Sequence, residues 1–233
     1  MFSELCLISS FTLFFFAVFL IVFLVVWMGF SKKKSFSETL QSVSSELNLK
    51  YHPGSWSRQP FAEGVYGGRR VKIEAYTCRS GENSSIKTRI IVEHNGKATA
   101  EMMLYKEGVL TKIGKALGMQ DIQLGNTEFD EKFLVKGKNP VQVKDILNFD
   151  LQHKLLTTYD YLNRGLLYVM PTLSGDTQRK ILTAYEHMIP NALPLKFDFQ
   201  SVVYEEYGYI NDKAKIKRLV DLLADISERA DKT

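Results

Sequence analysis

Residues that bind metals or act as nucleophiles are scarce in this chain. Its 233 residues include two cysteines and four histidines. The histidines are far apart in the sequence, at His52, His94, His153 and His187. No H-E-x-x-H or C-x-x-C pattern, G-x-S-x-G turn, dinucleotide fingerprint or kinase motif set is present. The sequence therefore predicts no metal site, no cofactor and no recognisable catalytic centre.

Excess charge is also scarce. Residues 1–34 contribute three lysines and one glutamate to the net charge of +4, which leaves +2 for the rest of the chain. A domain that binds nucleic acid through bulk charge is usually strongly basic. We therefore expect no nucleic-acid partner.

The two cysteines lie in different environments. Cys6 falls within an apolar run and Cys78 in the polar remainder, so we expect no disulfide between them. Free thiols fit a reducing compartment such as the cytoplasm. Asn83 begins an Asn-Ser-Ser glycosylation pattern, which would matter only outside the cell.

A long apolar run occupies residues 5–30, beginning at Leu5 and ending at Phe30, and contains no charged residue. As a helix, this run would be about 39 Å long, enough to cross a hydrocarbon core of about 30 Å. The sequence therefore predicts an uncleaved single-pass anchor in the lipid bilayer. A cleaved signal peptide would need a basic start, a shorter apolar core and a small-residue cleavage site, and the chain has none of these.

The flanks of this run predict its orientation. Lys32, Lys33 and Lys34 follow it, and no Lys or Arg precedes it. Basic residues beside a span stay on the cytoplasmic side, and aromatic residues such as Trp27 favour the interface. We expect an outside N-terminus and a cytoplasmic C-terminal domain.

A short amphipathic helix is expected next, over residues 35–49. Ser35 and Glu38 have the spacing of a capping box. The apolar stripe of this helix consists of Phe36, Leu40, Val43 and Leu47. This stripe could pack on the domain or lie on the bilayer. Packing is favoured because the polar face lacks the Lys and Arg of a surface helix.

Two consecutive β-hairpins are predicted between residues 61 and 105. The first turns at Gly67-Gly68 and the second at Asn95-Gly96, both typical two-residue turns. They predict an antiparallel sheet of about four strands. Arg69 and Arg70 would lie at one end of that sheet, as a solvated edge or as a contact for anions or lipids.

The second half alternates helices and strands. Phe129 and Phe133 are four residues apart and are expected as core anchors, and Asn139 before a proline is expected to cap a helix. The remaining predicted elements are a strand at 166–170, a helix at 176–189, an extended stretch at 195–204 and an amphipathic helix at 212–229.

Two short motifs carry a resemblance. One contains Gly64, Tyr66, Gly68 and Arg69, and the other is the stretch of residues 125–135 that contains Phe129 and Phe133. Together they resemble a family of uncharacterised prokaryotic membrane-anchored domains over about residues 60–160. The resemblance implies membrane anchoring but no activity, because that family has none assigned.

Asp130 and Glu131 are the carboxylates most like those of an enzyme, because they follow a conspicuous aromatic residue. Acidic residues are nevertheless common in a first helical turn, where they favour the helix dipole. The sequence therefore assigns no catalytic residue.

These observations predict an α+β protein with one N-terminal transmembrane helix, followed by an antiparallel sheet with packed helices. The expected segments are an anchor at 1–34, a helix and sheet at 35–118 and an α/β half at 119–233, with the last two as separate domains or as one. The leading hypothesis for function is a non-enzymatic interaction module at the inner membrane face, with a protein partner there. The alternatives are a membrane-bound enzyme with an unrecognised site and a domain that binds anionic lipids.

Overall fold

A computed structural model describes residues 2–55, 58–80, 83–95, 100–106, 120–162, 165–169 and 201–233. Its first element is a single long helix, α1 (Phe2–Glu46). The predicted helix start at Ser35 is wrong, because α1 passes through this residue without a break. Within a continuous helix, the backbone N–H groups of this turn already bond to the preceding turn, so a capping box has no free donors to satisfy.

The two parts of α1 have different environments. From Phe15 to Phe30 it carries exposed apolar side chains, including Phe19, Phe23 and Trp27. Within the described residues, α1 is the helix long and apolar enough to cross a membrane, with a mean hydropathy of 2.3 in its most apolar stretch. Its last turns are buried in the domain at Phe36, Leu40, Val43 and Leu47. The predicted packing of this stripe on the domain is thus confirmed.

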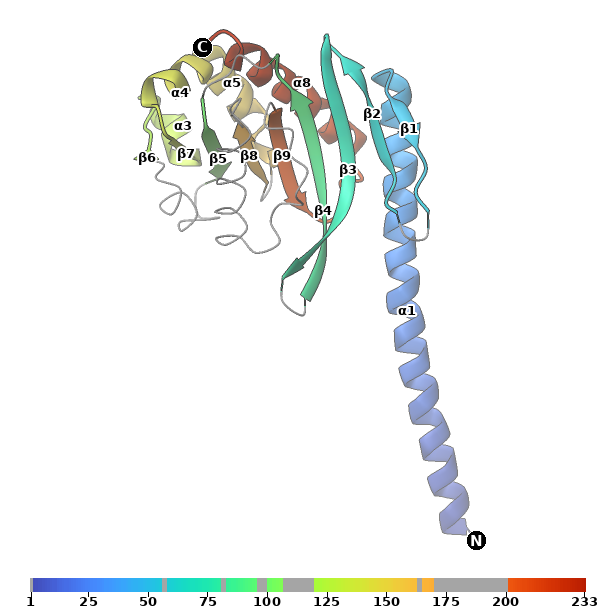
Figure 1. Cartoon of the computed structure of the whole chain (residues 1–233). Coiled ribbons are helices and arrows are strands. Elements are labelled where there is room, and N and C mark those ends of the chain that lie inside the picture. Colours follow the sequence, from blue (N-terminus) through green and yellow to red (C-terminus); the bar gives the residue numbers. More distant parts are fainter. Residues whose placement is uncertain are drawn as a thin grey trace, which may run out of the picture.

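The domain is built on one nine-stranded sheet in the order β1-β2-β3-β4-β9-β8-β5-β7-β6 (Figure 1). All of its strand pairs are antiparallel. The strands are β1 (Lys50–His52), β2 (Phe61–Tyr66), β3 (Arg69–Ser80), β4 (Asn83–Glu93), β5 (Met102–Lys106), β6 (Gln120–Asp121), β7 (Phe133–Gly137), β8 (Leu166–Val169) and β9 (Ser201–Tyr207).

The first predicted hairpin is confirmed. β2 and β3 pair across Gly67 and Gly68, whose φ angles are 59° and 78°. Positive φ at both central residues is the conformation of a type I′ turn, which glycine adopts without strain.

The second predicted hairpin is wrong. β4 pairs with β3 and β9, whereas β5 pairs with β7 and β8. The distant strand β9 occupies the edge of β4 that a local hairpin would have used. Its central residues Val202, Val203 and Tyr204 are fully buried, and this burial outweighs the local preference of an Asn-Gly turn.

In the described part of the chain, five further helices connect or cover the strands: α3 (Thr127–Lys132), α4 (Pro140–Ile146), α5 (Phe149–Thr157), α6 (Tyr159–Leu162) and α8 (Lys213–Ala230). Asn139 caps α4 as predicted, by accepting hydrogen bonds from the N–H groups of Val141 and Gln142. α8 covers the sheet through Ile216, Leu219 and Leu223, which are fully buried.

One hydrophobic core joins residues from both predicted halves. Ile73 and Ile90 come from the segment 35–118, while Phe129, Val135 and Leu219 come from the segment 119–233. The sheet likewise contains strands from both segments. The fold is α+β, with an antiparallel sheet and packed helices after an apolar N-terminal helix. The predicted helix at 176–189, and the first part of the stretch at 195–204, lie outside the described residues.

Candidate functional site

The two faces of the sheet differ in chemistry. Side chains alternate along a strand, so Val71, Ile73 and Ala75 of β3 point into the core. The residues between them, Lys72 and Glu74, lie on the opposite face. Cross-strand register continues this second face over β4 and β9, and we call it the charged face.

A row of alternating charges crosses the charged face. The register places Glu74 opposite Arg89, and Arg89 opposite Glu205. Arg89 forms an ion pair with Glu74, and Lys72 forms another with the same carboxylate at 2.8 Å. Lys87 lies 3.6 Å from Glu205. Facing pairs of opposite charge stabilise neighbouring strands, so this row has a structural role in addition to any functional one.

Burial shifts the pKa values of the charged side chains in this row. Burial alone would raise the pKa of Glu74, but Arg89 and Lys72 hold that pKa below its ordinary value. For Glu205 burial dominates and raises the pKa to about 8. Burial also lowers the pKa of Lys87. The two groups of the loose Lys87–Glu205 pair are therefore both shifted toward their neutral forms.

Glu205 has a second unusual feature. Its Oε1 atom is buried and has no hydrogen-bond partner in the described part of the chain. An unpaired buried carboxylate oxygen is costly unless the group is protonated or receives a ligand. Among the carboxylates of the charged face, Glu205 differs most from one with a purely structural role.

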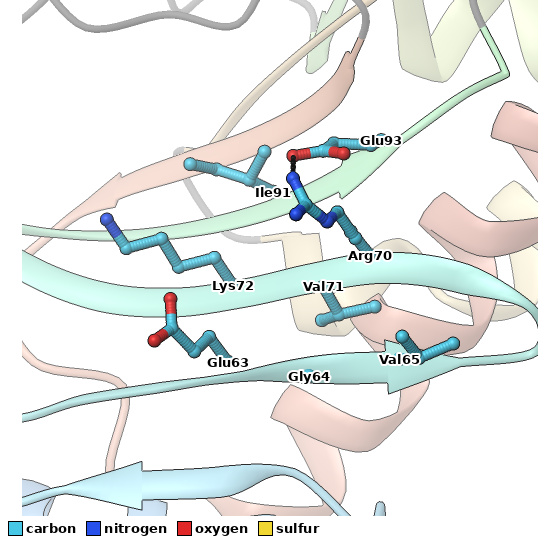
Figure 2. Close-up of a pocket in the computed structure, with 8 residues that line it drawn as sticks. All are labelled: Glu63, Gly64, Val65, Arg70, Val71, Lys72, Ile91 and Glu93. Atoms are coloured by element: carbon cyan, nitrogen blue, oxygen red, sulfur yellow. Dashed lines mark ion pairs between the residues drawn. The ribbon is translucent and has the colours of Figure 1, made fainter.

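A shallow groove of about 470 Å³ opens on the same face, over β2, β3 and β4 (Figure 2). Arg70 and Glu93 meet at one end of the groove at 3.7 Å, and Lys72 and Glu63 lie at the other. Ile91 pairs with Lys72 across β3 and β4, so it lies at the Lys72 end of the groove. A groove that combines an apolar side chain with charged ones suits an extended or amphipathic ligand.

The core side of β9 holds a second charged cluster, which is fully satisfied. Lys215 donates to both carboxylate oxygens of Glu206, at 2.8 and 2.6 Å. The Tyr204 hydroxyl donates to the Glu206 carboxylate at 2.5 Å and lies 2.8 Å from the Leu162 carbonyl, which also accepts from the Gly165 N–H. Because these polar atoms all have partners, this cluster stabilises the contact of sheet and helices.

The enzyme-like residues that the structure describes have separate, structural or exposed positions. Asp130 accepts hydrogen bonds from the backbone N–H groups of Leu124 and Gly125, at 3.0 and 2.9 Å, and so supports a loop. Glu131 and His153 are exposed, and His187 lies outside the described residues. Among the residues that the structure describes, no group of three or more metal-binding side chains forms a metal site.

Two sets of basic residues that the sequence suggested for membrane contact lie apart in the structure. One set is the lysine triplet at residues 32–34, and the other is Arg69 and Arg70. Lys33 lies beside the β1–β2 loop, where its Nζ donates to the Ser55 carbonyl at 2.9 Å. Arg69 lies at the far end of β2 and bonds to Asp231 at 2.6 Å and to Ser227 at 2.9 Å. Arg70 follows it and pairs with Glu93. The three lysines and the two arginines therefore do not form one patch.

Sequence reasoning missed Lys87, Arg89 and Glu205 as a cluster. The sequence contained a signal, because each of these three charged residues lies within a largely apolar strand. The alternation of apolar and polar residues along a strand would place such a charge in solvent. Their burial depends on how β3, β4 and β9 are ordered in the sheet, which local patterns do not reveal.

Comparisons with known proteins indicate only the fold. No family model and no curated protein matches the chain. Among solved structures, it is similar to the mycobacterial trehalose monomycolate transport factor A, TtfA, with a TM-score of 0.51 and 10% identity. That match covers 83% of this chain and 93% of TtfA. At this identity the likeness shows a shared fold and assigns no activity.

Proposed function

We propose that the chain is a single-pass membrane protein whose C-terminal domain is a binding module, held at the cytoplasmic face of the bilayer. The observation that carries this proposal is the continuity of α1. The same helix contains the apolar segment and, a few residues later, the fully buried Phe36 and Leu40. The domain is therefore joined to its anchor without a linker.

The charge around the apolar segment supports the cytoplasmic orientation. Lys32 and Lys34 are exposed where the apolar segment ends, and basic residues beside a span are retained on the cytoplasmic side. Holding a domain at one membrane face raises its effective concentration for partners in the same membrane.

The charged face favours binding over catalysis. Arg89 and Lys72 each pair with Glu74, and these contacts hold the three side chains in place. The groove beside them offers Ile91 next to the charged side chains of Lys72 and Glu63, which suits a protein segment that carries both apolar and charged residues. TtfA is named as a transport factor, and this fold analogy is compatible with a non-enzymatic role.

Partner capture from membranes in mild detergent tests this proposal. The full chain and an Ile91→Arg variant would be compared with Val141→Arg, a control that adds the same charge at an exposed site on α4. We expect one or more membrane proteins to be retained by the wild type and the control and lost from Ile91→Arg. Recovery of no partner by the wild type, or equal recovery by all three, would contradict the proposal.

A second candidate function, a membrane-bound enzyme, has one specific observation in its favour. Glu205 combines a pKa of about 8 with an unpaired oxygen and a neighbouring Lys87, and perturbed groups of this kind concentrate at active sites. This hypothesis predicts that membranes containing the wild type change their lipid or metabolite composition, and that those with Glu205→Gln do not. Identical compositions would exclude it.

A further inference from the structure

We propose that the end of the domain beside the apolar segment of α1 binds the phosphate groups of anionic phospholipids through Lys32, Lys34 and Arg58. This inference rests on the membrane anchoring proposed above. It replaces Arg69 and Arg70, the arginines expected from sequence, with one that only the fold brings near the lysines.

The β1–β2 loop is fixed against α1 at this point. The Nζ atom of Lys33 lies 2.9 Å from the Ser55 carbonyl and 3.5 Å from the Arg58 carbonyl, with the lysine as donor. The loop is also closed on itself, because Ser55 N–H donates to the Arg58 carbonyl at 2.9 Å. The Arg58 N–H donates in turn to the Ser55 hydroxyl at 3.2 Å. The backbone of Arg58 is thus held beside Lys33, the central residue of the lysine triplet.

The basic side chains of Lys32, Lys34 and Arg58 are available to bind an anion. Arg58 is exposed and stacks on Phe61, with its guanidinium carbon 4.6 Å from the ring centroid. No carboxylate pairs with Arg58 or Lys32 among the described residues. Lys34 reaches Glu38 only at 3.9 Å, and both side chains are mostly exposed, so that pair is weak.

The depth of these residues matches the headgroup layer. Lys34 follows the apolar run by four residues, or about 6 Å of helix rise, and the headgroup layer is about 5 to 7 Å thick on each side. Figure 1 shows the β1–β2 loop at the end of the domain from which the N-terminal part of α1 projects, and with the anchoring proposed above this end faces the bilayer. By contrast, the β2–β3 turn that carries Arg69 lies at the opposite end of the domain.

Hydrogen exchange on the full chain in nanodiscs tests the proposal. Discs of phosphatidylcholine alone would be compared with discs that also contain phosphatidylglycerol, and exchange would be followed in residues 50–61. We expect the anionic lipid to slow exchange in this loop by about fivefold, the effect of one basic side chain near an anionic surface. High salt should remove the difference because it screens exposed charges.

Three variants and one additional ligand make the result specific. Arg58→Glu should abolish the slowing and Arg58→Lys should keep it, whereas Lys144→Glu, the same charge change on an exposed α4 residue, should have no effect. Equal exchange in the two lipid compositions, or persistence of the slowing in Arg58→Glu, would overturn the proposal. Slowing by inorganic phosphate in phosphatidylcholine discs would overturn the assignment to lipid.

Failure of the anchor itself would be recognised separately. If alkaline carbonate extracts the full chain from membranes, α1 does not span them, and both the proposed function and the lipid contact are wrong. If the chain resists extraction but shows no difference between the lipids, only the lipid contact is wrong.

Discussion

Lys33 donates a hydrogen bond of 2.9 Å to the backbone carbonyl of Ser55, twenty-two residues further along the chain. This contact joins the helix, just after its apolar segment, to the first loop of the domain. Together with the burial of Phe36 and Leu40 three and seven residues later, it fixes the direction in which the domain leaves the helix. The orientation of the charged face relative to the apolar segment of α1 is therefore a property of the fold.

A break in α1 should make the orientation of the domain relative to the apolar segment variable. Ser35→Pro removes a backbone hydrogen bond inside the helix, at a cost of about 3 kcal/mol. We expect the distance distribution between spin labels at Glu4 and at the exposed Ala214 of α8 to broaden in this variant. Pulsed electron resonance on the full chain would measure it. The Ser35→Ala control should keep the narrow distribution of the parent, and a broad distribution in the parent would refute the rigid connection.

The second part of α1 should contribute to the stability of the domain. Leu40→Ala removes a fully buried side chain and should lower the free energy of unfolding by about 2 to 5 kcal/mol. Gln41→Ala, at the exposed neighbouring position, should change it by less than about 0.5 kcal/mol. Denaturant titration of the full chain in detergent compares the two. Similar midpoints for both variants would mean that α1 is not part of the cooperative core.

Gly165 should not accept a side chain. A Cβ atom at this position would collide with the ring of Tyr204, which is fully buried and held by its hydroxyl. We expect Gly165→Ala to lower the free energy of unfolding by about 1 to 3 kcal/mol, the range for overpacked cores. Adding Tyr204→Leu should recover part of this loss, and a double-mutant cycle of thermal midpoints would show the coupling. Purely additive effects would indicate that the two positions do not meet.

Glu205 should make stability depend on pH. Burial raises the pKa of this carboxyl from 4.5 to about 8, so between these values the folded protein binds a proton that the unfolded chain has released. Stability should therefore fall as pH rises from about 4.5 to 8, on the order of 1.4 kcal/mol for each unit of pKa shift realised. In Glu205→Gln this fall should be absent, as measured by denaturant midpoints across that range. Parallel curves for the two proteins would show that Glu205 is ionised in the fold and paired with Lys87.

Local signals in the sequence predicted local features correctly. The Gly67-Gly68 turn, the Asn139 cap and the buried positions of Phe129 and Phe133 all depend on residues within a few positions of one another. The signals at Ser35 and Asn95-Gly96 were equally strong, yet both predictions failed. In each case a partner from outside the motif, the preceding helix or the distant strand β9, satisfied the backbone groups that the local motif would have used.

The sequence by itself determined that the chain has an apolar helix followed by basic residues, because hydrophobic length and flanking charge are properties of consecutive residues. It likewise determined an α+β domain, through turn residues and apolar periodicity. Only the tertiary structure decided which charges meet. Strand order buried Glu205 beside Lys87, and the β1–β2 loop brought Arg58, not Arg69, to the lysines of α1. Such contacts depend on which strands pair across long stretches of chain, and that is settled by burial of the whole core.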